Sequence, residues 1–215
     1  ALSGPIVQEL QYSFMQDWYF MTDDDPEELL REEYFVSAAT EGSALVRLIN
    51  GGPATEVEEL TDVFFGTISQ AQEQILAVTP YFVPPPEIIR ALRAAAMRGV
   101  DVRLLLPAEN NHPYAGLAGR ALYAELLHAG VRIFEQPPPF IHAKAMIMDD
   151  VVALVGTANL DVRSLCLNYE SNLAVWDTAF VNNLKRIVLE DFARGREISL
   201  PEWERRPLRH RVAEN

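Results

Sequence analysis

His142 and Lys144 lie two positions apart, and together they are the clearest candidates for catalysis in the sequence. Side chains on an extended strand alternate between its two faces, so this spacing points an imidazole and an ammonium in the same direction. A neutral imidazole can act as a nucleophile, and an ammonium is a compact positive charge suited to a phosphate. The pair therefore indicates phosphoryl chemistry on one face of a strand.

A hairpin is predicted at this point of the chain, with strands at 143–148 and 151–155. Apolar residues on both sides of Asp149 and Asp150 favour two buried strands joined by a tight turn. The second strand would then end beside His142. Asp149 lies at the turn, far from the histidine, so we interpret it as a structural residue of the motif.

Three further residues follow the return strand and would lie beside the pair: Gly156, Thr157 and Asn159. An unhindered glycine backbone, a hydroxyl and a side-chain amide can each donate a hydrogen bond to a phosphate oxygen. We therefore predict that these three residues bind the substrate phosphate together with Lys144. Catalytic roles are predicted for His142, Lys144 and Asn159.

The spacing H-x-K-x4-D-x6-G-T-x-N, from His142 to Asn159, resembles the signature of the phospholipase D superfamily and of the bacterial cardiolipin synthases within it. Further similarity lies in TPYFVP at 79–84, GVDVRLLLP at 99–107 and LNYE at 167–170. The threonine of the G-T-x-N segment replaces the commoner serine and keeps its hydroxyl. The resemblance covers nearly the whole chain, but it corresponds to only the second half of such a protein.

This resemblance implies a two-step transfer, in which one histidine attacks a phosphodiester phosphorus and a second protonates the departing alcohol. Water or another alcohol then takes the phosphoryl group from the phosphohistidine. The family builds one site from two copies of the motif, in two repeats of one chain or in two identical subunits. Phosphatidylglycerol would be both donor and acceptor, and no metal or organic cofactor is expected.

Glu170 is a fourth catalytic candidate. In the resembling family a glutamate at this place, after the G-T-x-N turn, is a partner of the imidazole. Such a carboxylate orients the second ring nitrogen and stabilises the charge that develops on the ring. The alternative is a surface acid at the start of a strand predicted at 171–176.

The composition is typical of a globular domain with one sizeable core, since 49% of the 215 residues are apolar. No apolar run approaches the roughly 20 residues that a membrane-spanning helix needs. The single cysteine, Cys166, cannot form an intrachain disulfide and is compatible with a reducing compartment. The four histidines lack clustered cysteine or carboxylate partners, so no metal site is predicted.

The formal net charge of −13 comes mostly from the first 43 residues, which hold ten acidic side chains and one arginine. This leaves 21 of the 31 acidic and 17 of the 18 basic side chains for the rest of the chain. Such a balance lacks the basic footprint of a nucleic-acid-binding protein, so no nucleic-acid partner is expected. Basic residues gather at 185–211, where a solvated surface and a contact with anionic phospholipid headgroups are both open.

A helix is predicted at 5–22, with apolar residues at helical spacing on one face. The same spacing recurs 174 residues later in the chain. The matching pairs are Val7 and Val181, Leu10 and Leu184, Phe14 and Val188, Asp17 and Asp191, and Trp18 and Phe192. Together with the family resemblance, this recurrence suggests that the first helix is the last element of a preceding repeat.

The stretch at 26–43 is acidic and without periodicity, so we interpret it as a linker between repeats. Residues 1–43 are therefore predicted to be the last helix of a preceding repeat plus an acidic linker. Residues 44–215 are predicted to be the phospholipase D-like catalytic domain, as the second repeat.

Strands and helices alternate through this second region, which predicts an α/β fold with a layered, mixed β-sheet flanked by helices. Besides the hairpin, strands are expected at 44–49, 75–79, 100–106, 131–134 and 171–176. Helices are expected at 57–71, 87–98, 114–128 and 178–194. The residues after the last helix read as polar helix or coil.

The sequence thus favours a phosphatidyltransferase that makes cardiolipin from phosphatidylglycerol, with this chain as its C-terminal half-site domain. Its partners would be the lipid, a membrane surface, and either an N-terminal repeat of the same protein or a second copy of this chain. The resemblance places it at the bacterial cytoplasmic membrane, anchored by a segment outside this sequence. Two alternatives stay open: a homodimeric phosphodiesterase or nuclease, which the acidic charge disfavours, and a catalytically silent assembly domain, which the intact motif disfavours.

Overall fold

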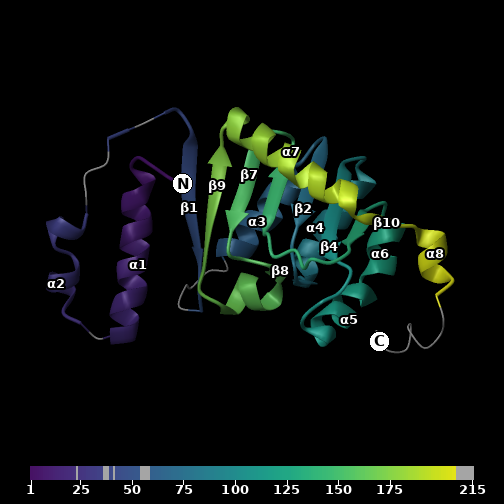
Figure 1. Cartoon of the computed structure of the whole chain (residues 1–215), viewed down its shortest axis with the longest axis horizontal. Coiled ribbons are helices and arrows are strands. Elements are labelled where there is room, and N and C mark those ends of the chain that lie inside the picture. The colour runs from purple at the N-terminus through teal and green to yellow at the C-terminus, as the bar shows by residue number, and fades with distance from the viewer. Residues whose placement is uncertain (23, 36–38, 41, 54–58, 207–215) are drawn as a thin grey trace.

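The computed structural model describes residues 1–22, 24–35, 39–40, 42–53 and 59–206, and Figure 1 shows their arrangement. Within these residues an eight-stranded sheet has the order β1-β9-β7-β6-β2-β4-β5-β10. Its strands are β1 (Leu45–Gly51), β2 (Gln74–Val78), β4 (Asp101–Pro107), β5 (Arg132–Gln136), β6 (Ala145–Met148), β7 (Val152–Gly156), β9 (Glu170–Trp176) and β10 (Arg196–Ile198). The predicted α/β fold with a mixed sheet is confirmed.

The sheet is mixed because it contains both parallel and antiparallel neighbouring strands. Strands β2, β4 and β5 run parallel to one another, whereas every other neighbouring pair in the sheet is antiparallel. Parallel neighbours need a crossover, and helices supply it here. These helices are α4 (Pro86–Met97), α5 (Pro113–Ala121) and α6 (Tyr123–His128).

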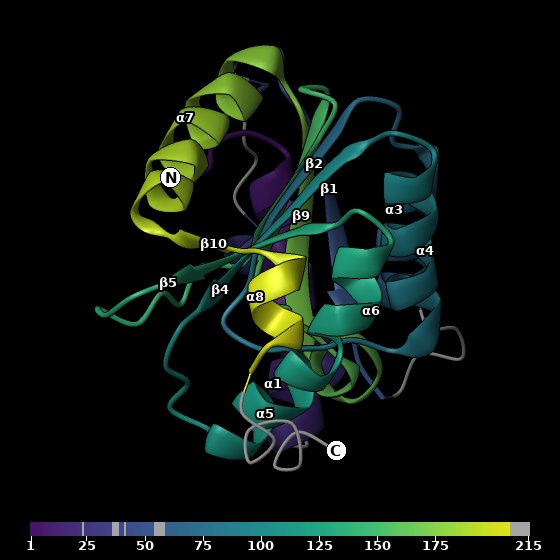
Figure 2. The same cartoon turned by 90° about the vertical axis from the view of Figure 1, so that its right-hand side faces the viewer.

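Helices cover both faces of the sheet, as Figure 2 shows. Helix α7 (Thr178–Arg194) lies on one face, where Val181, Val188 and Phe192 are buried against the strands. Helices α3 (Glu59–Gln70), α4 and α6 lie on the opposite face and enclose the larger core. Because apolar layers cover both faces of the sheet, the polar site residues lie at the ends of the strands.

Local signals in the sequence explain where several helices begin and end. The Asp177 side chain accepts a hydrogen bond from the Phe180 N–H at 2.7 Å and so caps the start of α7. Gly99 and Gly130 follow α4 and α6 with φ angles of 96° and 93°, in the left-handed region that favours glycine. The two helices end at Met97 and His128, within one residue of the ends predicted at 98 and 128.

The β6–β7 hairpin closes through a turn in which Asp149 and Asp150 both have positive φ angles, of 50° and 55°. The Asp149 carboxylate accepts hydrogen bonds from the backbone N–H groups of Gln72, Glu73 and Gln74 at 2.7 to 2.8 Å. Burial alone would raise the pKa of Asp149, but these three N–H groups hold it below its usual value. This geometry agrees with the structural interpretation of Asp149.

The structure differs from the prediction in several local elements. The single helix predicted at 114–128 is two helices, α5 and α6, which meet at Leu122. The helix predicted at 57–71 is α3 (Glu59–Gln70) within the described residues, and its predicted start at 57–58 lies outside them. Short elements without a clear sequence period were also missed: β3 (Phe82–Val83), β8 (Leu160–Asp161), the π-helix η2 (Arg163–Leu167) and β10. The helix α8 (Leu200–Glu204) lies in the stretch that was predicted as polar helix or coil.

Helix α1 (Ile6–Thr22) agrees with the predicted helix, but its surroundings were not foreseen. It lies beside β1 at the outer edge of the sheet (Figure 1), where the Asn50 Nδ2 donates a hydrogen bond of 2.9 Å to the Ser13 Oγ. Phe14 is 53% exposed, whereas Val188, its match on α7, is 4% exposed. The matching apolar faces therefore differ in burial: α7 buries its face against the sheet, whereas much of the face on α1 is exposed to solvent.

The predicted linker at 26–43 is described only in part, since residues 36–38 and 41 are outside the described residues. Its described part holds a short helix, α2 (Pro26–Leu29), and a 3-10 turn, η1 (Glu32–Tyr34). Asp25 begins α2 by accepting a hydrogen bond from the Glu27 N–H at 2.9 Å. No residue of α2 or η1 is buried.

Candidate active site

The predicted site residues come together at one end of the strands of the sheet, where β6 and β9 begin and β7 ends. His142 and Lys144 directly precede β6, Gly156 ends β7, and Glu170 begins β9. Because β6 and β7 are antiparallel, the start of one lies beside the end of the other, and Ala145 is paired with Val155. The hairpin prediction is confirmed, although the first strand begins two residues later than expected.

His142 and Lys144 point to the same side of the chain. The Lys144 Nζ lies 3.3 Å from both ring nitrogens of His142. It also donates a hydrogen bond of 2.9 Å to the His142 carbonyl oxygen. The imidazole is exposed and the lysine is half-buried. The His142 carbonyl oxygen therefore holds the ammonium in place, while the ring remains accessible to a substrate.

Lys144 has two acidic neighbours. Burial of the amine lowers the pKa of Lys144, and the negative charges of Glu170 and Asp161 oppose this shift. The two carboxylates therefore help to keep the side chain as an ammonium, which is the form that binds phosphate. Sequence reasoning missed Asp161, although its position two residues after Asn159 was a possible signal.

Gly156 and Thr157 connect the end of β7 to β9. A Cβ on Gly156 would lie 2.4 Å from both the Asn172 Oδ1 and the Ser171 carbonyl oxygen, so only glycine fits at this approach. The Thr157 Oγ1 accepts a hydrogen bond from the Ser171 N–H at 2.9 Å, and the Thr157 N–H donates to the Ser171 carbonyl at 3.1 Å. These contacts give both residues a structural task, and phosphate binding by them stays a prediction.

Asn159 is half-buried at the same edge. Its Nδ2 donates a hydrogen bond of 3.0 Å to the Oγ of Ser164, which is buried in η2. Its Oδ1 is buried without a partner among the described residues. The side chain is thus held on one side only, and its donation to a phosphate oxygen stays a prediction.

Glu170 is buried rather than exposed, so the alternative of a surface acid does not fit its position. Its Oε1 accepts a hydrogen bond from the Asn168 Nδ2 at 3.2 Å. Among the described residues, Glu170 acts on Lys144 through its charge and makes no hydrogen bond to His142. The structure therefore relates this carboxylate to the lysine of the pair.

Two aromatic rings lie next to His142, and a third lies next to one of them. The Tyr81 ring lies edge-on at 6.4 Å from the His142 ring, and the Phe140 ring lies at 6.0 Å. The His112 ring is 5.5 Å from that of Tyr81. No role was predicted for Tyr81 or His112 from the sequence, yet both line a cavity of about 510 Å³ that Asn159 also lines.

The arrangement can hold a phosphate and attack it. The imidazole and the ammonium share one exposed surface, and two carboxylates lie behind the ammonium. In the part of the chain that the structure describes, no group of three or more His, Cys, Asp and Glu side chains converges as metal ligands. None of the described helices is long and apolar enough to cross a bilayer.

Residues 64–192 match the family model described as "Cardiolipin synthase, PLD-like domain". The chain is 39% identical over 216 residues to the cardiolipin synthase of Geobacillus kaustophilus, a match that covers 100% of this chain and 42% of that protein. It is 38% identical over 202 residues to cardiolipin synthase A of Pseudomonas fluorescens, covering 94% of this chain and 41% of that protein. The chain thus spans about two fifths of the length of these curated relatives.

Two solved structures share the fold. Nuc from Salmonella typhimurium, a phospholipase D family member, has a TM-score of 0.63 and 21% identity, covering 73% of this chain and 99% of that chain. The phosphatidylserine synthase of Haemophilus influenzae has a TM-score of 0.61 and 16% identity, covering 76% of this chain and 42% of that chain. At these identities the similarity concerns the fold alone.

Proposed function

The chain belongs to the cardiolipin synthase family of phospholipase D-like domains, and from this premise we propose that it forms one half of a phosphatidyltransferase site. The reaction moves the phosphatidyl group of one phosphatidylglycerol to a hydroxyl of another and releases glycerol. The relatives named cardiolipin synthase support this substrate class.

One observation carries the proposal: the contact between the Lys144 ammonium and both ring nitrogens of His142. An imidazole attacks a phosphodiester best when a fixed positive charge binds the nonbridging oxygens and stabilises the charge of the transition state. The hydrogen bond to the His142 carbonyl holds the ammonium in place before substrate arrives. This arrangement supports Lys144 as the phosphate-binding residue and His142 as the reacting one.

The transfer takes two steps that balance. One imidazole, His142 or its counterpart, attacks phosphorus, so that a P–N bond forms and the bond to the departing glycerol oxygen breaks. That oxygen takes a proton from the second imidazole. A hydroxyl of the acceptor lipid then gives its proton back to the second imidazole, and its oxygen bonds to phosphorus as the P–N bond breaks.

Because an imidazole bonded to phosphorus cannot protonate the leaving oxygen, the site needs a second histidine from another domain. We assign it to a preceding repeat in a longer protein, whose last helix is α1. The exposed face of α1 supports this assignment, because the matching face of α7 is buried against a sheet. Residues 1–43 would then belong to that repeat and its linker, and residues 44–215 to the second repeat.

A membrane surface is the expected second partner, because a lipid phosphate must reach His142. The segment after Asp161 presents exposed apolar side chains at the same edge of the sheet as the site, notably Val162, Leu167 and Tyr169. Apolar and aromatic side chains around a cationic residue are typical of a surface that contacts a bilayer. Such a contact would place this domain at the bacterial cytoplasmic membrane, with the anchor in another segment of the protein.

One observation favours a second arrangement, in which two copies of this chain complete the site as a homodimeric phosphodiesterase. The match to Nuc covers 99% of that chain, so a single domain of this fold constitutes a whole chain in the superfamily. This alternative keeps His142 and Lys144 in the same roles and changes only the source of the second histidine.

A dilution series tests the proposal. Phosphatidylglycerol cleavage per chain is measured across a wide range of protein concentrations, with the mass of the particle followed by light scattering. We expect an inactive monomer and an activity per chain that rises steeply with concentration as dimers form. Full activity from a demonstrated monomer would contradict the requirement for two histidines.

A further inference from the structure

The cavity beside Tyr81 lies next to the reacting pair and has no role in the account above. It has a volume of about 510 Å³, within the range of roughly 300–1,000 Å³ of small-ligand sites. Tyr81 lines it and also contacts His142, while Asp161 lines it and acts on the charge of Lys144. The cavity therefore shares Tyr81 and Asp161 with the surroundings of the reacting pair.

The lining is polar on one side and carries one charge of each sign. Asp161, Arg163 and Ser164 lie along it, together with Asn159. Such groups suit hydroxyls and a phosphate better than an acyl chain, which needs an apolar lining. The polar side of the cavity thus fits a lipid headgroup, whereas Tyr81, Val83, Ala115 and Val162 form an apolar side.

Asp161 offers an acceptor for hydroxyl groups. Its Oδ1 accepts a hydrogen bond from the Ser164 N–H at 2.6 Å, and its Oδ2 makes no hydrogen bond within the described part of the chain. A glycerol headgroup carries free hydroxyls, each of which donates one hydrogen bond. The free carboxylate oxygen can therefore take a hydroxyl of glycerol without losing its contact in η2.

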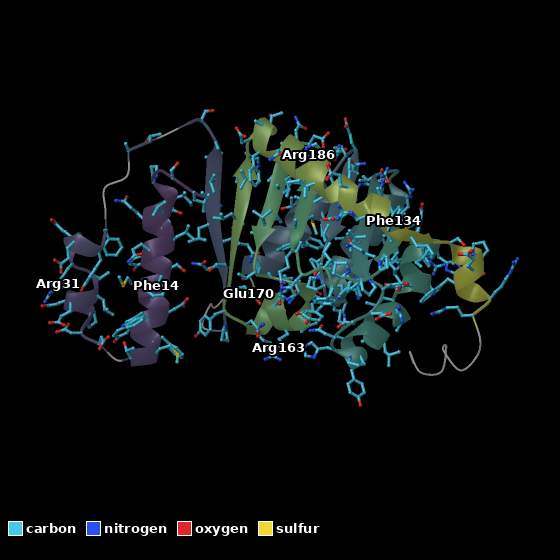
Figure 3. The ribbon with its side chains drawn as sticks, in the orientation of Figure 1. Phe14, Arg31, Phe134, Arg163, Glu170 and Arg186 are labelled. Atoms are coloured by element: carbon cyan, nitrogen blue, oxygen red, sulfur yellow. The ribbon has the colours of Figure 1, made fainter. Side chains whose placement is uncertain are left out.

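Arg163 supplies the complementary donor. Its Nε donates to the Asn168 Oδ1 at 3.2 Å, while its terminal nitrogens have no hydrogen bond to the other described residues. In Figure 3 this side chain lies at the lower edge of the domain, below Glu170. A guanidinium held at Nε with its other nitrogens exposed is suited to binding a second phosphate.

We propose that this cavity is the subsite of the acceptor, a glycerol-headed phosphodiester lipid, with Asp161 binding the glycerol hydroxyls and Arg163 the acceptor's own phosphate. This assignment rests on the proposed transferase function. It explains the pairing of opposite charges, because an acceptor phosphatidylglycerol brings both hydroxyls and a phosphate. It also places an acceptor hydroxyl beside His142, where its oxygen bonds to phosphorus as the P–N bond breaks and its proton passes to the second imidazole.

The first test compares acceptors. The Asp161→Asn variant keeps the Oδ1 that binds the Ser164 N–H but loses the charge. We expect its ratio of transfer to hydrolysis to fall by about 10-fold or more, as for a lost hydrogen bond to a charged group. Asp150→Asn, the same change at the far end of the hairpin, should keep the ratio of the original protein. An unchanged ratio in Asp161→Asn overturns the role of Asp161.

The second variant separates the two ends of the headgroup. Free glycerol has no phosphate, so in Arg163→Gln the ratio of transfer to phosphatidylglycerol over transfer to free glycerol should fall by about 10-fold. Melting curves confirm that each variant is folded. Equal losses with the two acceptors would overturn the assignment of Arg163 to a phosphate.

A binding measurement tests the subsite without depending on catalytic turnover. Saturation-transfer NMR with glycerophosphoglycerol, the soluble headgroup portion of the acceptor, should show contact to the glycerol protons that is lost in Asp161→Asn. Absence of this contact in the original protein overturns the subsite even where lipid is turned over. Binding without cleavage of any phosphodiester by a protein that contains both halves of the site would uphold headgroup binding in the cavity and contradict the proposed function instead.

Discussion

The Lys144 Nζ lies 2.9 Å from the His142 carbonyl oxygen and 3.3 Å from both nitrogens of the His142 ring. The backbone of the histidine therefore positions the ammonium that its own side chain needs. A charge fixed in this way needs little reorganisation when phosphate arrives, which is the main requirement for electrostatic catalysis.

Replacing Lys144 with methionine should lower phosphatidyl transfer by about 100-fold or more, because the phosphate loses its fixed positive charge. The chain contains one other lysine, Lys185, whose ammonium pairs with Asp150 at 2.6 Å on the far side of the hairpin. Lys185→Met is therefore the matched control and should retain activity. Steady-state rates on phosphatidylglycerol vesicles decide the matter, and equal rates in both variants would remove Lys144 from the site.

Glu170→Gln should lower turnover by about 10-fold or more and shift its pH dependence. Burial lowers the pKa of Lys144 and the charge of Glu170 raises it, so removing that charge lowers the pKa further. Because the ammonium form binds phosphate, the alkaline limb of the pH–rate profile should move to lower pH. The exposed Glu190→Gln on α7 is the control. A profile identical to that of the original protein would leave Glu170 with a packing role only.

Asp149→Asn should lower the free energy of unfolding at pH 7 by about 1–3 kcal/mol, because three backbone N–H groups lose a charged acceptor. The pKa of Asp149 is lowered on folding, so its stabilisation is present above about pH 4 and is lost as the pH falls through the folded-state pKa. Urea titrations of both proteins should therefore converge in strong acid. Asp150→Asn, which removes one half-exposed ion pair, should cost only about 0–1 kcal/mol. A constant difference between Asp149→Asn and the original protein at every pH would contradict this account.

Leu167→Ser should weaken binding of the chain to vesicles that contain anionic lipid. Leu167 is 60% exposed and follows Arg163 in the segment beside the site, so it has apolar surface to bury in a bilayer. Met97→Ser, at a position on α4 that is 74% exposed, is the control. Cosedimentation with vesicles measures the effect, and equal binding of the two variants would exclude this edge as the membrane contact.

The sequence predicted much of the site because its signals are local. A two-residue spacing placed His142 and Lys144 on one side, and an apolar hairpin with two aspartates at its turn placed Asp149 far from them. The alternation of strands and helices predicted the mixed sheet. Each of these inferences depends on residues close together in the chain.

What the sequence did not predict depends on contacts between distant segments. The π-helix η2 has no period of its own, so the Asn159–Ser164 hydrogen bond and the position of Asp161 had no clear signal. The exposure of Phe14 was also unforeseen, because periodicity identifies an apolar face but not what covers it. Lys144 and Glu170 likewise become related only when β6 and β9 join the same sheet.

The most direct measurement of the central claim is a crystal structure with phosphate bound. We expect one anion within hydrogen-bond distance of the His142 ring, the Lys144 Nζ and the Asn159 side chain, with the Asn159 amide turned from Ser164 toward it. An anion bound elsewhere, with these three side chains facing different surfaces at saturating phosphate, would contradict the assignment of this edge as the phosphoryl-transfer site.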